Sequence, residues 1–189
     1  NSSGTMGLLI AQVARFRGGK VKYIHGPLKT NMEITEGIER HEIETSEELN
    51  NAIKKEISNC DFFIMNAAVS DFKVVGNTSK KITKNEFENY LIDNIELVPD
   101  ILKDICKSKK ENQIFLGFCA FTGSFENSKK TIKEKLITKG CDLLFANPID
   151  IEGQGFGPFA KNEGWLFDKK NMEYHIEKTT KIDLANQLL

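Results

Sequence analysis

The spacing of apolar residues divides the chain into helical and extended segments that alternate. Apolar residues at helical spacing, together with helix-start residues, predict five helices. They are residues 6–16, 46–57, 99–106, 128–139 and 181–189. Short runs that are apolar throughout, or that alternate apolar with polar residues, predict strands. They are residues 21–24, 38–43, 62–66, 90–97, 114–118, 143–147, 164–167 and 172–176.

These elements predict an α/β fold with a mostly parallel sheet. Strands that are apolar on both sides, such as 114–118 and 143–147, require helices on both faces of the sheet. The last two strands flank a turn at 168–171 and predict a C-terminal antiparallel hairpin. No repeat or linker divides residues 1–189, so we expect a single domain. Because a loop directly before a helix opens the sequence, we expect a first strand upstream of residue 1.

Composition excludes several classes of partner. The 26 Lys and Arg nearly balance the 27 Asp and Glu, so the net charge does not favour binding to nucleic acid or to an anionic membrane. Any anion site must therefore depend on a local group of charges. The four cysteines are dispersed without a Cys-x-x-Cys pair, which favours reduced thiols in a cytoplasmic protein over disulfides or structural zinc. No apolar run is long enough to cross a membrane.

The strongest candidate chemistry follows the strand at 62–66. Ala67 and Ala68 leave room for a planar base or a ligand backbone, and Asp71 supplies a carboxylate. Three lysines follow Asp71 within the length of one loop: Lys80, Lys81 and Lys84. Ligands of open α/β sheets bind at the carboxyl ends of strands, so this stretch predicts a site for a charged substrate, with phosphate as the leading candidate. The alternative is a solvated charged loop.

Other segments offer further anion-binding groups, each with a plainer alternative. Ser2, Ser3 and Gly4 open the first helix as a phosphate-cradling turn would, and also fit an ordinary helix cap. Residues 99–102 form a second helix start of the same kind. Lys135 and Lys139 share one helix face, where they could reach one anion or face solvent. Phe118 could stack on a base or belong to the core. The three histidines are dispersed and suggest neither a triad nor a metal site, so metal ligands stay unknown.

The order of these motifs is more specific than any one of them. Ser-Ser-Gly-x-Met-Gly opens a helix, and His-Gly-Pro follows the next strand. Then come Ala-Ala-Val-Ser-Asp-Phe, Lys-Ile-x-Lys, Pro-Asp-Ile-Leu, Gly-Phe-x-Ala-x-Thr, a lysine pair before Lys-Gly-x-Asp-Leu, and Ala-Asn. Over residues 1–189 the chain thereby resembles the phosphopantothenoylcysteine synthetase (phosphopantothenate-cysteine ligase) family. In many bacteria this domain is the C-terminal half of a bifunctional coenzyme A biosynthesis protein whose N-terminal half is a flavin-dependent decarboxylase.

The resemblance implies a Rossmann-like homodimer that joins 4'-phosphopantothenate to cysteine through an acyl-cytidylate, using CTP and Mg²⁺. It implies that Lys81 promotes formation of the acyl-cytidylate, that Asp71 binds the nucleotide, and that Ala67 and Ala68 flank its base. It also implies nucleotide contacts from Pro99, Asp100, Ile101, Leu102, Phe118, Lys135 and Lys139, and a phosphate or substrate loop at Ser2, Ser3 and Gly4.

Two positions depart from the family pattern. The family reads Asn-x-Ser-Ser-Gly, and Asn1 falls at the x position, so the catalytic asparagine is expected just upstream of residue 1 or is absent. Phe121 stands where relatives often carry a glutamate, so that residue's role does not transfer.

Two other functions fit part of the pattern. An NAD(P)-dependent Rossmann-fold oxidoreductase would also use a serine-glycine turn before a helix, but the strand at 21–24 ends in His-Gly-Pro rather than in the acidic residue expected to bind a ribose. A nucleotide-binding domain without catalytic activity is the third alternative.

Overall fold

The computed structural model describes the whole chain except residues 1–2, 31, 76–82, 84–85 and 155–160. Its helices are α1 (Thr5–Phe16), α2 (Ser46–Glu56), α3 (Phe87–Asn94), α4 (Ile101–Cys106), α5 (Phe125–Lys139) and α6 (Lys181–Leu188), with a 3₁₀ turn η1 (Ile57–Asn59). Its strands are β1 (Val21–His25), β2 (Ile38–Glu42), β3 (Phe62–Met65), β4 (Phe72–Val74), β5 (Ile95–Leu97), β6 (Ile114–Phe121), β7 (Leu143–Pro148), β8 (Asn162–Asp168) and β9 (Glu173–Thr179).

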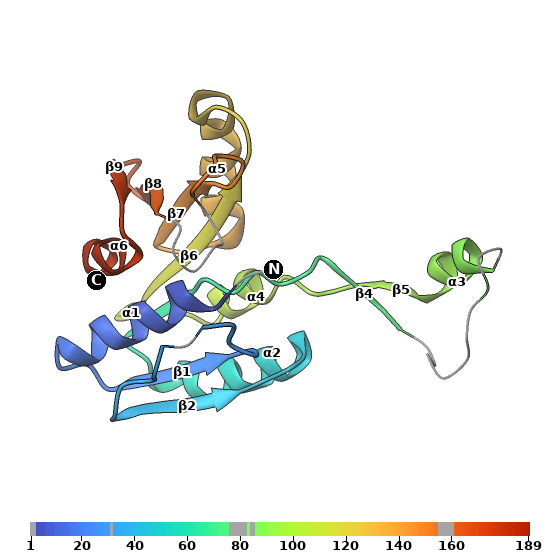
Figure 1. The fold of residues 1–189 in the computed structure, drawn as a ribbon, viewed down its shortest axis with the longest axis horizontal. Helices are drawn as coiled ribbons and strands as arrows, with labels where there is room; N and C mark the ends of the chain where they lie inside the picture. The colour runs from blue at the N-terminus through green and yellow to red at the C-terminus, as the bar shows by residue number, and fades with distance from the viewer. Residues whose placement is uncertain (1–2, 31, 76–82, 84–85, 155–160) are drawn as a thin grey trace.

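The main sheet has five strands in the order β3-β6-β7-β8-β9. β3, β6 and β7 run parallel, and β8 and β9 add the predicted antiparallel hairpin at one edge. β1 and β2 form a separate parallel pair, and the described residues do not hydrogen-bond this pair to the main sheet (Figure 1). The mostly parallel, Rossmann-like α/β arrangement is therefore confirmed, although it is split into two sheets.

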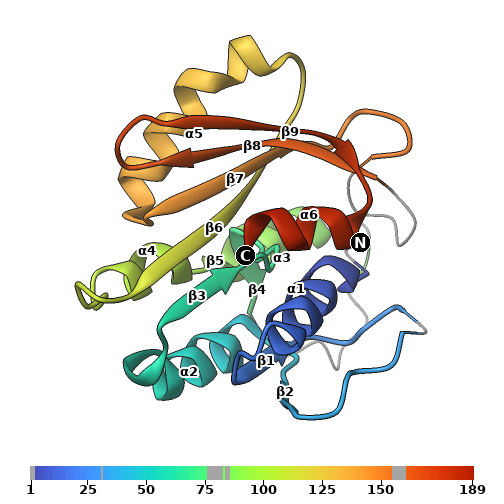
Figure 2. The ribbon, with the colours of Figure 1, turned by 90° about the vertical axis from the view of Figure 1, so that its left-hand side faces the viewer.

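Helices cover both faces of the main sheet, as predicted. On one face α4 and α5 pack through a buried cluster that includes Leu102, Ile132 and Leu136. On the other face α1 and α6 lie side by side and contribute Leu9 and Leu184 (Figure 2). The continuous apolar character of β6 and β7 follows from this double cover.

Local side chains explain where several helices begin and end. The hydroxyl of Thr45 accepts from the Glu48 N–H while the Glu48 carboxylate accepts from the Thr45 N–H, which forms a capping box before α2. Ser124 caps α5, so this helix begins three residues earlier than predicted. Gly140, with a φ of 77°, ends α5 in the left-handed conformation that favours glycine.

The strand predicted at 90–97 is wrong for most of its length. Residues 90–94 belong to α3, and only residues 95–97 are extended, as β5. Leu91 and Ile95 are four residues apart, so this pattern of apolar residues fits a helix as well as a strand.

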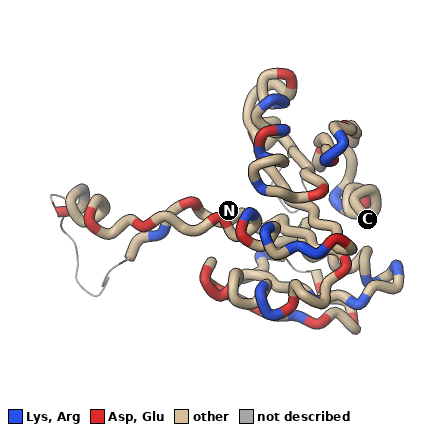
Figure 3. Tube along the Cα trace, turned by 180° about the vertical axis from the view of Figure 1, so that it is seen from behind, with Lys and Arg blue, Asp and Glu red and all other residues tan. Residues whose placement is uncertain are grey.

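β5 pairs antiparallel with β4, a three-residue strand that is too short to show a period and was not predicted. We call β4, α3 and β5 the arm. Figure 1 shows that it projects from the body of the molecule, and Figure 3 shows the same projection from behind. Within the described residues, no helix is both long enough and apolar enough to span a membrane.

Candidate functional site

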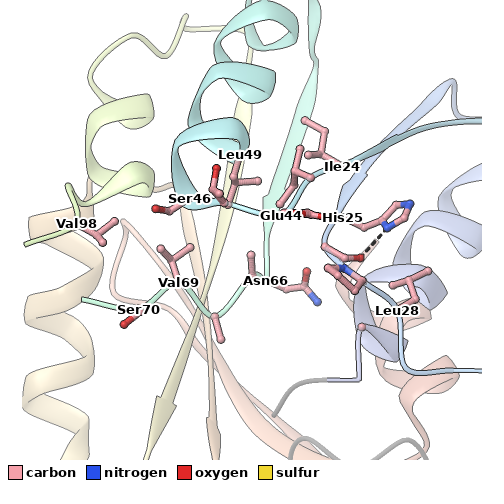
Figure 4. Close-up of a pocket in the computed structure, with 18 of the residues that line it drawn as sticks. Ile24, His25, Leu28, Glu44, Ser46, Leu49, Asn66, Val69, Ser70 and Val98 are labelled. Carbon is pink, nitrogen blue, oxygen red and sulfur yellow. Dashed lines mark hydrogen bonds between the residues drawn. The ribbon is translucent and has the colours of Figure 1, made fainter. Parts of the chain in front are cut away.

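A pocket of about 400 Å³ lies at the carboxyl ends of β1 and β3, beside the first turn of α1 (Figure 4). Its wall includes Gly4 and Gly7 of the α1 region, His25 at the end of β1, and residues 66–70 after β3. Ligands of open α/β sheets bind at this edge. The pocket is therefore the first candidate for a substrate site.

The first turn of α1 is held against β1 and the following loop. Gly4 has a φ of 79°, and a Cβ there would lie 2.5 Å from Leu28 Cδ2, so the position requires glycine. The Tyr23 hydroxyl donates to the Gly4 carbonyl oxygen at 3.4 Å, and the Lys29 N–H donates to the Ser3 carbonyl oxygen at 3.0 Å. These contacts fix a helix N-terminus, whose N–H groups and dipole favour an anion, at the wall of the pocket.

The predicted phosphate loop is described only in part. Gly4 lines the pocket, whereas Ser2 lies outside the described residues. Ser3 is buried, and its Oγ lies 2.8 Å from Thr5 Oγ1 and accepts the Thr5 N–H at 3.3 Å. The Ser3 hydroxyl thus helps to shape the start of α1.

Tyr23 and His25 are residues of this site that the sequence analysis did not single out. Their rings stack at 4.9 Å between centroids, and His25 Nδ1–H donates to the Gly26 carbonyl oxygen at 2.8 Å (Figure 4). Burial raises the pKa of Tyr23 to about 12, and the protonated hydroxyl donates to the Gly4 carbonyl oxygen. The only sequence signal was the His-Gly-Pro motif, because a stack between two residues of one strand carries no pattern of its own.

Ala67 and Ala68 line the pocket next to Asn66. A Cβ on Gly7 would lie 3.0 Å from Asn66 Oδ1, so α1 approaches the end of β3 this closely because residue 7 is glycine. Asp71 is exposed at the base of the arm and does not line the pocket, although its neighbours Ser70 and Phe72 do. The two alanines and the Asp71 carboxylate thus follow one another along the segment after β3.

A second group of predicted residues meets on α4 and α5. Asp100 caps α4, because its Oδ1 accepts the Lys103 N–H at 3.1 Å. Its Oδ2 accepts from Lys139 Nζ at 2.5 Å. The structure therefore brings two predicted nucleotide contacts together and sets a cation beside the start of α4.

Lys135 and Phe118 are predicted nucleotide contacts that lie on opposite faces of β6. Lys135 Nζ approaches Cys119 Sγ at 3.5 Å, on the face covered by α5. Phe118 packs with the cluster of α1 and α6, and its ring meets Phe145 at 5.3 Å in an edge-on arrangement. One flat ligand cannot contact both side chains through the sheet, so a shared ligand would have to cross the strand end.

Residues 99–102 divide between surface and core. Pro99 is exposed, whereas the side chains of Ile101 and Leu102 are buried, with 4% and 6% of their surface exposed. Any contact of Ile101 or Leu102 with a ligand would therefore use the backbone.

Some predicted residues fall outside the described part of the chain. They are Lys80, Lys81 and Lys84. Among the described residues, no group of three or more His, Cys, Asp or Glu side chains could hold a metal ion.

Comparison with known proteins identifies relatives over the full sequence. The coenzyme A biosynthesis bifunctional protein CoaBC of Borreliella burgdorferi is 33% identical over 191 aligned residues, which cover 100% of this chain and 45% of that protein. A protein named cysteine/cysteine sulfinic acid decarboxylase, from an unknown prokaryotic organism, is 29% identical and is covered over 50% of its length. The chain thus spans about half the length of the curated relatives it matches.

Solved structures share the fold. The C-terminal domain of CoaBC superposes with a TM-score of 0.76 at 25% identity, covering 99% of this chain and 81% of that chain. A mutant of Cab2 in complex with phosphopantothenate-cysteine gives a TM-score of 0.72 at 14% identity, covering 100% of this chain and 77% of that chain, which supports the fold alone. The family model described as the DNA/pantothenate metabolism flavoprotein C-terminal domain matches residues 1–189, and the chain belongs to this family.

Proposed function

We propose that this chain is a phosphopantothenate-cysteine ligase domain of coenzyme A biosynthesis, which uses CTP and forms an acyl-cytidylate. The observation that carries the proposal is the convergence of three motifs on one pocket. Gly4, the turn from His25 to Pro27, and the pair Ala67 and Ala68 lie far apart in the sequence and share its wall. The relatives named as coenzyme A biosynthesis proteins support the same pathway and do not favour the oxidoreductase alternative.

The geometry supports a division between two substrates. The pocket beside α1 has the N-terminus of a helix at its wall and is large enough for an elongated acid that ends in phosphate. The Asp100 and Lys139 pair lies on the other elements, α4 and α5, and offers a cation for the nucleotide phosphates. Ala67 and Ala68 line this pocket and Asp71 follows them in the chain, so the carboxylate of the acid would meet the α-phosphorus of CTP near this segment.

Carboxylate activation explains why lysines are needed. A carboxylate oxygen attacks the α-phosphorus of CTP, pyrophosphate leaves, and the amine of cysteine then displaces CMP from the acyl carbon. Charge moves onto phosphate oxygens in the first step, so Lys81, Lys135 and Lys139 would act by neutralising it. A bound Mg²⁺ would supply further positive charge for the phosphates of CTP, alongside these lysines.

The partner reaction follows from the same proposal. A flavin-dependent phosphopantothenoylcysteine decarboxylase, fused or separate, would consume the product. A reaction that uses soluble substrates also suits a cytoplasmic protein.

The decisive experiment measures pyrophosphate release before cysteine is added. Full-length natural protein is mixed with phosphopantothenate, Mg²⁺ and either CTP or ATP. We expect pyrophosphate release with CTP, and we expect the amide of phosphopantothenate and cysteine to form only after cysteine is supplied. A preference for ATP would correct the nucleotide, and no release with either nucleotide would refute the ligase proposal. Parallel titration with NADH tests the oxidoreductase alternative, since tight NADH binding without CTP binding would favour it.

We further propose that the arm forms a homodimer. Its two strands expose Phe72, Val74 and Leu97, which keep 55%, 49% and 82% of their surface accessible. An isolated two-stranded pair with uncovered apolar side chains is marginally stable. A second copy would supply an identical arm, and pairing by two-fold symmetry would cover both sets of side chains.

Replacing Leu97 with lysine is expected to convert the dimer to a monomer, because a charge would enter the covered apolar surface. Ile137→Lys is the matched control, since Ile137 on α5 is 79% exposed and lies away from the arm. Light scattering coupled to size exclusion measures both variants. A wild-type monomer, or a dimer that persists in Leu97→Lys, would refute the arm as the interface.

A further inference from the structure

Cys106 and Cys141 form a thiol pair outside the proposed substrate site. Cys106 is the last residue of α4, and Cys141 directly follows Gly140, the residue that ends α5. Cys141 belongs to a buried cluster, and Cys106 packs against the same cluster. They are 35 positions apart in the sequence, so it is the packing of α4 against the end of α5 that brings them together.

Two glycines make room for this pair. A Cβ on Gly140 would lie 3.5 Å from Cys106 Cβ, so the chain that carries Cys141 passes close to Cys106. A Cβ on Gly117 would lie 3.2 Å from Cys141 Sγ, so the absent side chain in β6 leaves space for that sulfur. These close approaches place Cys106 and Cys141 side by side where α4 meets the end of α5.

The pair also has the asymmetry of a reactive thiol and its resolving partner. Contact with the Cys106 thiol lowers the pKa of Cys141, and the same contact raises the pKa of Cys106. Cys141 is fully buried, whereas Cys106 is partly exposed at the end of a short helix. Such helix ends open locally at low cost, which gives a small oxidant access.

We propose that Cys106 and Cys141 are a redox-sensitive pair that a hydroperoxide converts into an intrachain disulfide. The Cys141 thiolate attacks one peroxide oxygen and becomes a sulfenic acid, while the other oxygen leaves as hydroxide and takes up a proton. The Cys106 sulfur then attacks the sulfenic sulfur, and its proton leaves with the displaced hydroxide as water. With hydrogen peroxide, two thiols and one peroxide give one disulfide and two waters.

The link would tie the end of α4 to the start of β7. Asp100 and Lys139, the ion pair described above, lie on the same two helices. A disulfide would therefore fix the distance between the elements that carry this pair. The inference about the thiols does not depend on the ligase proposal, because the link is detected in the protein itself.

Hydrogen peroxide added to the reduced protein tests the proposal, followed by peptide mapping without reductant. We expect one linked species that joins the Cys106 and Cys141 peptides, a mass loss of two hydrogen atoms, and reversal by dithiothreitol. The melting temperature should rise by several degrees in the oxidised form, because the disulfide constrains the unfolded chain.

Two variants make the outcome decisive. Cys106→Ser removes the partly exposed thiol and should abolish the link, whereas Cys60→Ser, which changes a cysteine outside the pair, should leave it intact. Peptides of Cys106 and Cys141 that stay unlinked while peroxide oxidises either sulfur to a sulfinic acid would overturn the proposal. So would a link that involves Cys60 or Cys119 instead.

Discussion

Replacing Lys139 with glutamine is expected to slow CTP-dependent pyrophosphate release by about a hundredfold, which is the usual cost of removing one group that stabilises transition-state charge. Lys139 Nζ is held at 2.5 Å from Asp100 Oδ2, so its charge is directed to the start of α4 before substrate arrives. Glutamine keeps a similar length and polarity and removes the charge. The rate of carboxylate activation should therefore fall, and this rate is measured as pyrophosphate release before cysteine is added.

The control for this variant is Lys130→Gln. Lys130 is exposed on the same helix, so its loss changes the net charge by the same amount without touching Asp100. Asp100 still caps α4 in Lys139→Gln, and exposed ion pairs contribute about 0–1 kcal/mol, so the melting temperature should hardly change. Equal rates in Lys139→Gln and the wild type, or equal losses in both variants, would remove Lys139 from the nucleotide site.

Elements with strong local chemistry could be predicted from the sequence. The turn between β8 and β9 is an example, because Asp168 Oδ1 accepts the N–H groups of Lys170 and Met172 at 2.8 Å each, and Asn171 adopts a positive φ of 64°. Both residues are common in turns for these reasons. The buried strand at 143–147 was equally clear. A short apolar run bounded by Gly140 and Pro148 is typical of a buried strand and too short for a helix.

The arm could not be predicted in the same way. Its helix and strands depend on contacts that span many residues, and the apolar side chains Ile92 and Leu97 point outward. The alternation of apolar and polar residues over 90–97 predicted one strand, on the assumption that its apolar residues face the interior of the same chain. That assumption fails for Ile92 and Leu97, which are exposed in this chain.

The site shows a similar limit. The motif residues were found because they combine small side chains, carboxylates and lysines at strand and helix ends. Their partners were not found, because the bond from Tyr23 to Gly4 and the pair of Asp100 with Lys139 join residues that are distant in sequence. The burial of individual side chains could not be predicted either, because the spacing of residues did not show that Leu102 faces the core.

The largest loss of stability is expected from Gly164→Ala, at a position where β8 lies directly against buried residues of the neighbouring strand β7. A Cβ there would overlap the ring of Phe145 and lie 2.6 Å from the Ala146 carbonyl oxygen. Phe145 and Ala146 are fully buried, and the carbonyl belongs to a paired strand, so neither atom can move without disturbing the sheet. We expect the free energy of unfolding to fall by about 3 kcal/mol, the upper part of the usual range for an overfilled core.

Urea unfolding of Gly164→Ala beside Gly26→Ala separates this cause from a general effect of replacing glycine. A Cβ on Gly26 would meet only the Ile43 carbonyl oxygen, at 3.7 Å, and Gly26 does not have a positive φ, so its change in stability should stay within about 0.5 kcal/mol. Adding Phe145→Leu to Gly164→Ala removes the ring overlap but keeps the carbonyl contact. If overlap causes the loss, the double variant should lose less than the sum of the two single losses. Strict additivity, or equal losses at Gly164 and Gly26, would mean that β8 can shift away from β7 at little cost.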